Sequence, residues 1–269
     1  MMWRPLWAIT ARELKRMVRQ RGRLVSALVR PLIWLLIIGT GFEAMLGRLG
    51  PGGYQQFLVP GLIGMVLLFG AMLASLSLVY DKESGVMRML LIAPFSRPWI
   101  VIARTGSAAM AAIAQAVMLI IVLIPLGHFP SEVSPTWLAL GLLATALTCA
   151  TIGMLIAVWA KSLDNFAVIM NFVIFPVFFL SGALYPLQHL PVALKMLSAV
   201  NPFSYGVDLL KHAMATALPQ PFGTDFTIAT DLGVMAGFVA AGTALAAVRF
   251  SQSSVHETLA GLLSLRQQR

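Results

Sequence analysis

The sequence predicts an all-α membrane protein with six transmembrane helices, and three observations support this fold class. Hydrophobic residues make up 59% of the 269 residues and charged residues only 11%, whereas soluble domains carry about 25% charged residues. Six apolar stretches are long enough to approach or exceed the roughly 20 residues that cross a bilayer core. No stretch alternates apolar and polar residues with the period of two that is typical of half-buried strands.

The first expected element is an amphipathic helix at residues 1–23 that lies in the membrane interface. Trp3, Trp7, Leu14 and Val18 lie close to one helical stripe, and basic residues occupy the other sides. Apolar residues spaced by three or four beside a basic face are typical of interfacial helices. A solvated basic tail is the alternative, and the two tryptophans on the apolar stripe favour the interfacial helix.

The predicted transmembrane domain covers residues 24–250, and a short cytoplasmic tail, 251–269, follows it. Between the fifth and sixth spans, residues 186–228 are too many for a tight turn and too apolar for a disordered loop. Proline and Asn-Pro signals favour two short helices there, so we expect an outer re-entrant or interfacial segment. The six spans are expected at residues 24–46, 57–79, 99–126, 136–160, 166–185 and 229–250.

The distribution of lysine and arginine predicts the orientation of the chain. With the amino terminus in the cytoplasm, all but three of the 19 basic residues lie at or near the inner face, the exceptions being Arg48, Lys195 and Lys211. Cytoplasmic loops carry an excess of Lys and Arg, so both termini are expected inside. Because the net charge of +9 lies mostly beside apolar spans, we expect contact with membrane lipid and no nucleic-acid partner.

The sequence lacks the motifs of soluble enzymes and of metal sites. It contains no GxxxxGK[ST] phosphate loop, HExxH zinc helix, GxSxG elbow or paired CxxC. The single cysteine, Cys149, lies in an apolar run and is expected to be a buried hydrophobic side chain. The histidines lie in separate loops or in the tail and are expected to be solvated: His128, His189, His212 and His256. We therefore predict no catalytic residue, no metal site and no cofactor in this chain.

The fifth predicted span carries candidates for a translocation pathway or a subunit seam. Asn171 lies near its mid-depth, and Phe172, Phe175 and Phe179 recur at helical spacing. A phenylalanine stripe is more often packing than a ligand site. A mid-membrane asparagine, however, commonly faces another helix or a cavity.

Two other predicted spans carry weaker signals. Met65, Phe69 and Met72 form a flexible, polarizable row in the second span, which suits loosely specified hydrophobic ligands and is also ordinary core filler. Gly233 and Gly237 in the sixth span have the spacing that lets helices approach closely. The sequence does not identify the helix that would approach them.

The loop between the second and third predicted spans, which contains YDKESGVMRMLLIAPFSRPW at residues 80–99, is polar in an otherwise apolar chain. Glu83 and Gly85 begin it, residues 86–93 have the pattern of a short helix, and Pro94 ends that helix. This arrangement predicts a short helix held between two spans at the inner face.

This short helix is apolar on more than one side. One side can pack under the spans while another fills the groove of a partner protein, with Glu83 and Arg88 as rim charges. A solvated connector is the alternative, but it would expose several large apolar side chains to the cytoplasm. One apolar stripe comprises Val86, Met89, Leu90 and Ala93, and Met87 and Leu91 lie away from it.

The loop resembles that of the permease subunits of ABC-2 type transporters, which carry an acidic residue, a glycine, a short helix and a proline there. The resemblance covers nearly the whole chain. It includes FLVPGLIGM at the second span, FLSGALYPLQHLP after the fifth and NPFSYGVDLLKHAM before the sixth. The residues of the last two motifs are most similar to those of the bacterial drug-resistance and lipooligosaccharide-export branch.

The resemblance implies that the short helix, near residues 83–94, is a coupling helix that docks on a separate ATP-hydrolysing subunit. The chain itself is then a permease and not an enzyme, and ATP and Mg are bound by the partner ATPase. The residues expected to couple the two subunits are Glu83, Gly85, Met87, Arg88, Leu90, Leu91 and Pro94.

The same resemblance implies a bacterial inner-membrane permease that works as a homodimer with two copies of the ATPase. Alternating access would drive efflux of an amphipathic drug, as in multidrug export, or of a lipid or lipid-linked saccharide. Two other functions stay open. One is a non-transporting sensory ABC complex, and the other is a membrane-embedded lipid-modifying enzyme, for which the sequence offers no convergent polar set at one depth.

Overall fold

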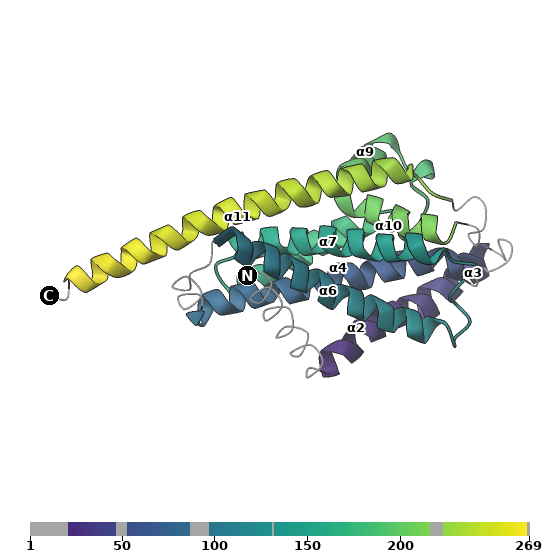
Figure 1. Cartoon of the computed structure of the whole chain (residues 1–269). Coiled ribbons are helices and arrows are strands. Elements are labelled where there is room, and N and C mark those ends of the chain that lie inside the picture. The colour runs from purple at the N-terminus through teal and green to yellow at the C-terminus, as the bar shows by residue number, and fades with distance from the viewer. Residues whose placement is uncertain (1–20, 47–52, 87–96, 131, 216–222, 268–269) are drawn as a thin grey trace.

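A computed structural model describes residues 21–46, 53–86, 97–130, 132–215 and 223–267, and every regular element in these ranges is helical. The helices form an elongated bundle, from which the last helix extends beyond one end (Figure 1). In chain order the elements are α2 (Arg21–Ile33), the π-helix η1 (Trp34–Gly39), α3 (Thr40–Leu46), α4 (Gly53–Glu83), α6 (Arg97–Leu123), α7 (Pro135–Trp159), α8 (Leu163–Phe179), the short 3-10 helix η2 (Leu187–His189), α9 (Val192–Val200), α10 (Pro202–Ala213) and α11 (Ile228–Gln267).

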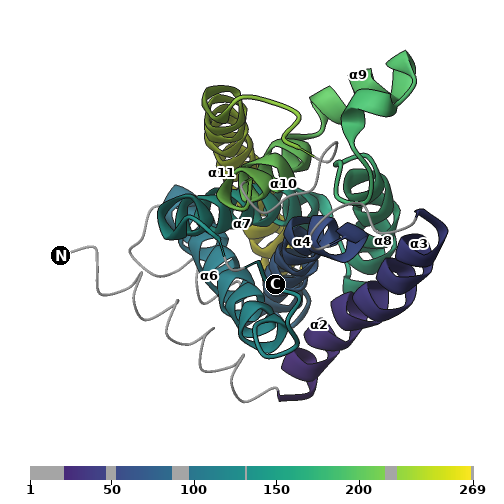
Figure 2. The same ribbon diagram turned by 90° about the vertical axis from the view of Figure 1, so that its right-hand side faces the viewer.

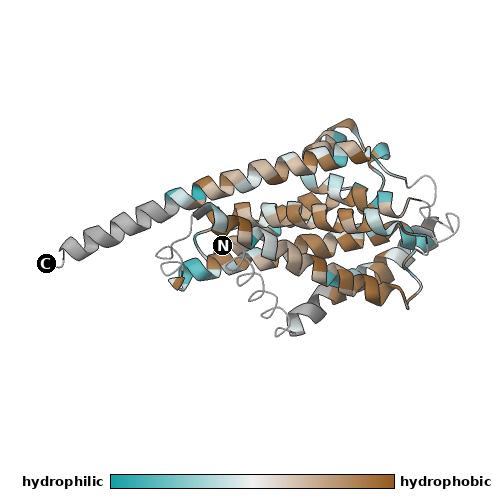
Figure 3. Cartoon of the chain, in the orientation of Figure 1, coloured by the Kyte–Doolittle hydropathy of each residue, from teal (hydrophilic) through white to brown (hydrophobic). Residues whose placement is uncertain are grey.

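Five helical stretches in the described part of the chain are long and apolar enough to cross a membrane: Leu28–Met45, Gly53–Glu83, Pro98–Leu123, Pro135–Trp159 and Ile228–Gln252. They confirm an all-helical, multi-span architecture. The predicted fifth span, 166–185, corresponds to α8, an apolar helix of only 17 residues. Residues along the middle of the bundle are mostly hydrophobic, and hydrophilic residues gather toward its two ends (Figure 3).

Different elements lie at the two ends of the bundle. We call them the Glu83 end, where α4 finishes beside the α7–α8 junction, and the α9 end, where α9 and α10 lie (Figure 1). The described part of α11 passes the Glu83 end as a continuous helix. It runs well beyond position 250, where the sequence predicted the sixth span to stop.

Helix α4 occupies the centre of the bundle and contacts α2, α6, α7, α8 and α10 (Figure 2). Its residues are buried almost without interruption from Phe57 to Leu68. A helix that is apolar on every face is suited to this central position. The predicted second span, 57–79, is therefore part of a longer helix that includes Glu83.

Small residues set the closest helix approaches. A Cβ atom added at Gly61 of α4 would lie 2.5 Å from the carbonyl oxygen of Ala183, in the turn after α8. A Cβ atom at Gly206 of α10 would lie 2.8 Å from the Thr145 side chain of α7. Such close approach is typical of membrane helix packing. No atom of the described residues lies within 4 Å of a Cβ atom added at Gly237, so this predicted contact glycine faces away from the described helices.

Helix α8 begins three residues before the predicted fifth span and ends six residues before that span's predicted end, and both of its ends are fixed locally. At its start the Ser162 hydroxyl accepts a hydrogen bond from the backbone N–H of Asn165 at 3.2 Å, which caps the helix. At its end the chain turns through Gly182, whose φ of 75° favours glycine. The residues from 180 to 185 therefore leave the helix.

The segment predicted as a re-entrant or interfacial helical pair, 186–228, holds η2, α9 and α10 in its described part. Helix α9 exposes Val192, Met196 and Val200. Helix α10 instead packs against α7 and α11 and buries most of its side chains. Two helices are thus present, with different environments, and a re-entrant path stays a prediction. The predicted interfacial helix, 1–23, lies almost wholly outside the described residues.

Candidate functional site

The last turn of α4 joins two other helices at the Glu83 end. The Lys82 ammonium donates hydrogen bonds to the carbonyl oxygens of Ala157 at 2.9 Å and Val158 at 2.8 Å, at the end of α7. The Glu83 carboxylate accepts a hydrogen bond at 3.1 Å from the backbone N–H of Leu163, at the start of α8. Lys82 thus places a positive charge at the negative, carboxyl end of α7, and Glu83 places a negative charge at the positive, amino end of α8. Any displacement of the end of α4 therefore acts on α7 and α8 together.

A buried ion pair joins α4 to α6 two residues before Glu83. The Arg104 guanidinium of α6 pairs with the Asp81 carboxylate and also donates to the Ser77 hydroxyl at 3.1 Å. Both charged side chains are more than nine-tenths buried. Removing one partner of such a pair leaves an uncompensated buried charge, so the pair holds the two helices in one relative position.

Two of the predicted coupling residues lie in the described part of the chain. Glu83 is the last residue of α4, and Gly85 follows with a φ of 75° that turns the chain away from the helix axis. Both residues are exposed, as is Val86. The other predicted coupling residues lie outside the described residues: Met87, Arg88, Leu90, Leu91 and Pro94.

The phenylalanine stripe of α8 lies on an exposed surface. Phe172 is 79% exposed, Phe175 and Phe179 are exposed too, and Asn171 lies beside them. The π-helix η1 adjoins α8, where Trp34 packs edge-on against Phe178. Figure 2 shows α8 beside the α2–α3 segment on one side of the bundle. We call the surface of exposed α8 side chains beside η1 the α8–η1 face, and it comprises Val168, Asn171, Phe172, Phe175 and Phe179.

The candidates from the second predicted span lie elsewhere. Met65 and Met72 are buried in the core around α4. Phe69 is half-buried, and the Arg30 guanidinium of α2 lies 3.9 Å from the centre of its ring. Within one copy of the chain, Met65 and Met72 are thus packing residues that do not reach the α8–η1 face. A role for them in a pathway stays a prediction.

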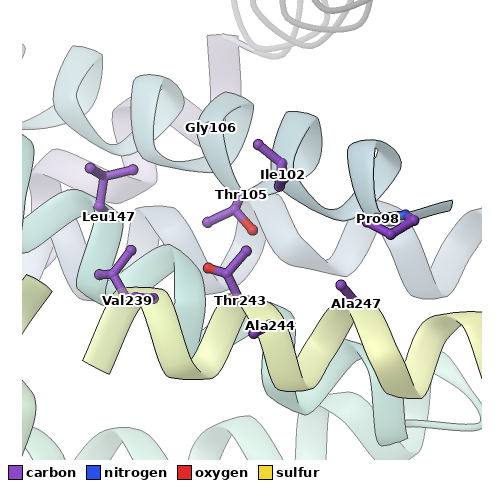
Figure 4. Close-up of a pocket in the computed structure, with 10 residues that line it drawn as sticks. Pro98, Ile102, Thr105, Gly106, Leu147, Val239, Thr243, Ala244 and Ala247 are labelled. Carbon is purple, nitrogen blue, oxygen red and sulfur yellow. The ribbon is translucent and has the colours of Figure 1, made fainter. Parts of the chain in front are cut away.

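A groove of about 520 Å³ runs between α6 and α11 (Figure 4). Its described lining is apolar apart from the hydroxyl groups of Thr105 and Thr243, and no charged side chain is among those described lining residues. This chemistry suits an acyl chain or another apolar group. The lining residues are Pro98, Ile102, Thr105, Gly106, Leu147, Val239, Ala240, Thr243, Ala244 and Ala247.

A buried polar cluster at the α9 end was not predicted. The Asp208 carboxylate of α10 accepts hydrogen bonds from the backbone N–H groups of Asp225 at 2.7 Å and Phe226 at 2.9 Å. The Lys211 ammonium pairs with the Asp225 carboxylate at 2.8 Å. Burial raises the pKa of the Asp208 carboxyl above its usual value, although the backbone donors and Lys211 act in the opposite direction.

His212 belongs to the same cluster, and its predicted solvation is wrong. Its side chain is only 15% exposed and faces two carboxylates. The spacing of Asp208, Lys211 and His212 by three and four residues already places them on one side of a helix. This helical spacing could be recognised in the sequence. The approach of Asp225 and Asp231 could not be recognised there, because it depends on the tertiary fold.

Comparison with known proteins identifies the family. Residues 4–215 match the family described as ABC-2 type transporter. The chain belongs to this family. This ABC-2 protein is 28% identical over 223 residues to nodulation protein J of Rhizobium leguminosarum bv. viciae, with 80% of its own length and 82% of the relative covered. It is also 28% identical over 242 residues to the inner membrane transport permease YadH of Escherichia coli K12, covering 89% and 91%.

These matches make the chain a transporter permease subunit with several membrane-spanning helices. They confirm the family expected from the motifs of the sequence. Membership of the ABC-2 family also implies an ABC transporter in which ATP is hydrolysed by a partner subunit.

Proposed function

We propose that this ABC-2 permease is the transmembrane subunit of an exporter of the bacterial inner membrane. Two copies work with two copies of a separate ATPase that binds ATP and Mg. The Glu83 end lies in the cytoplasm together with both termini, in keeping with the strong excess of basic residues on that side. YadH, a relative over 91% of its length, is named as an inner membrane transport permease, which supports this location.

The observation that carries the proposal is the three-helix junction at the end of α4. Lys82 holds the end of α7, and Glu83 holds the start of α8. A coupling helix directly after Glu83 would pull on this junction when the ATPase subunits close. Because nucleotide binds the open and closed ATPase pair with different affinity, it shifts the permease between two conformations. The junction would convert that shift into a movement of α7 and α8.

The α8–η1 face supports assembly as a homodimer. It presents several large apolar side chains and one amide, Asn171, on one side of the bundle. Apolar side chains can face lipid without a protein partner. A polar amide near mid-membrane, in contrast, is stabilised by a partner helix or a cavity. We propose that two copies meet along this face. The cavity opened by alternating access would lie at the seam, with Asn171, Phe172, Phe175 and Phe179 on its wall.

The substrate class follows from the chemistry of these surfaces. Aromatic side chains with an occasional amide suit an amphipathic molecule better than a strongly hydrated one. An amphipathic drug, a lipid or a lipid-linked saccharide has this character. The resemblance of FLSGALYPLQHLP and NPFSYGVD to the drug-resistance and lipooligosaccharide-export branch favours the same class.

Cysteine cross-linking tests the seam directly. Cys149 is the only cysteine of the chain and is buried. A Cys149→Ser chain therefore provides a background without thiols. We expect Phe172→Cys in this background to form a disulfide-linked dimer upon mild oxidation in membranes. Val248→Cys on α11 is the matched control, because Val248 is also exposed but lies on a different helix. A disulfide requires Cα atoms within about 7 Å, which makes random collisions inefficient.

The two variants also define what would contradict the proposed seam. Cross-linking of Val248→Cys without cross-linking of Phe172→Cys would move the interface to α11. If neither variant forms a dimer while a chemical cross-linker does, the α8–η1 face is not the seam. Absence of any dimer in the assembled complex would remove the homodimer from the proposal.

A further inference from the structure

The cluster at the α9 end contains three potential metal ligands that the transport function does not use. Asp208 and His212 lie one turn apart on α10, and Asp231 lies in the first turn of α11. The His212 Nε2 atom is 3.6 Å from Oδ2 of Asp208 and 3.6 Å from Oδ2 of Asp231. One ligand atom from each residue lies within 4.8 Å of the other two.

The charges of this cluster are not balanced by its described residues. Lys211 pairs with Asp225, whose other oxygen accepts a hydrogen bond from the backbone N–H of Leu187 at 3.1 Å. Two carboxylates, Asp208 and Asp231, are left facing a single imidazole. Buried carboxylates are stable when they are paired or coordinate a metal ion. The cluster therefore favours an additional positive charge.

The additional positive charge is expected beside Asp231. Its side chain is 0% exposed, and neither carboxylate oxygen has a hydrogen-bond partner among the described residues. The carboxylate is directed at His212 and Asp208. A buried carboxylate without a hydrogen-bond donor is costly and calls for an explanation, of which a bound ion is one.

We propose that Asp208, His212 and Asp231 bind one divalent transition-metal ion of the zinc class. An imidazole nitrogen with two carboxylate oxygens is a ligand set for zinc and related ions, whereas calcium and magnesium prefer oxygen ligands alone. Metal–ligand bonds of about 2.0–2.2 Å place neighbouring ligand atoms about 3.0–3.5 Å apart. The two separations of 3.6 Å from His212 need only a small contraction, and the two carboxylate oxygens, which lie within 4.8 Å of each other, would have to reach the same spacing.

The surroundings of the three ligands are consistent with such a site. The Asp208 carboxylate is oriented by the backbone N–H groups of Asp225 and Phe226, as ligating carboxylates usually are. The Phe226 carbonyl oxygen lies 3.0 Å from His212 Nε2, close enough to become a fourth ligand once the metal replaces their hydrogen bond. Bound in this way, the ion joins α10 to the start of α11 and to the loop between them. This inference does not depend on the transport function.

Zinc binding by the purified full chain, carrying an affinity tag without histidine, tests the site. We expect about one zinc ion per chain by titration calorimetry and by metal analysis after gel filtration. His212→Gln and Asp231→Asn should each weaken binding by at least about tenfold. His189→Gln is the matched control, because His189 is exposed at the same end of the bundle and lies outside the cluster. This control should bind zinc like the unaltered chain.

Cobalt(II) provides a second measurement that needs no variant. Bound at three or four nitrogen and oxygen ligands, it should give the visible absorption of a low-coordinate site in the unaltered chain, and zinc should displace it. Absence of this absorption would overturn the proposal, and so would equal zinc binding by the unaltered chain and the Asp231→Asn variant. A loss of binding in His189→Gln as large as that in His212→Gln would also overturn it, because zinc would then bind to exposed side chains outside the cluster.

Discussion

Reversing the charge of Glu83 should weaken the junction between α4 and α8. The carboxylate accepts one hydrogen bond from the Leu163 N–H at 3.1 Å and lies at the positive end of α8. A carboxylate at a helix amino terminus contributes about 0.3–1 kcal/mol when it is exposed. A lysine in its place removes this term and adds a repulsion of similar size. The total, about 0.6–2 kcal/mol, changes the equilibrium between joined and separated helices by a factor of about 3–30.

The assay measures ATP hydrolysis and substrate movement in the same preparation. The permease and its ATPase are reconstituted in proteoliposomes, and ATP-driven accumulation of a fluorescent amphipathic dye is recorded together with phosphate release. We expect Glu83→Lys to lower the dye accumulated per ATP hydrolysed several-fold while the helical content and the melting temperature change little. Glu83→Gln, which keeps a hydrogen-bond acceptor, should have a smaller effect.

Asp164→Lys is the matched control for this experiment. Asp164 is another exposed acid at the Glu83 end, in the first turn of α8, but it belongs to the helix itself and does not join α8 to α4. The variant makes the same charge change close to the same place. An unchanged ratio of accumulation to hydrolysis in Glu83→Lys, or an equal loss in Asp164→Lys, would refute the reasoning.

Two further predictions concern the stability of the bundle. Gly61→Ala should lower the free energy of unfolding by about 1–3 kcal/mol, because its Cβ atom would lie 2.5 Å from the Ala183 carbonyl oxygen. Gly237→Ala, which meets open space, should leave the melting temperature unchanged or slightly raised, and equal effects would contradict the packing. Lys211→Met should destabilise the chain by about 3–5 kcal/mol because buried carboxylates lose their cation. Adding Asp225→Asn should recover part of this loss, and strict additivity in thermal unfolding would contradict the pairing.

The helices could be predicted from apolar composition, but their ends depend on contacts that composition does not show. The charges at Asp81, Lys82 and Glu83 suggest the end of a span, yet α4 continues because each of them finds a partner or a helix terminus on α6, α7 or α8. Helix α8 stops early because of Gly182, whose positive φ is set by the turn that follows. Hydropathy alone ends the second span before Asp81 and extends the fifth span over residues 180–185.

The candidate sites illustrate the same difference between local and long-range signals. The stripe at Phe172 and Phe175 was readable because helical spacing is local, and these side chains do share one exposed face. Met72 matched the same kind of pattern but lies in the core, since periodicity does not say which face of a central helix is covered. The cluster around His212 required Asp231, which only the packing of α11 on α10 brings close.

Association with an ATPase tests the central claim most directly. The tagged permease is produced together with the ATP-binding-cassette ATPase proposed as its partner, purified from membranes and assayed for ATP hydrolysis. We predict that the ATPase copurifies in equal amount and that hydrolysis occurs only when it is present. ATP hydrolysis by the permease purified alone, or failure of the permease to retain the ATPase, would contradict this account.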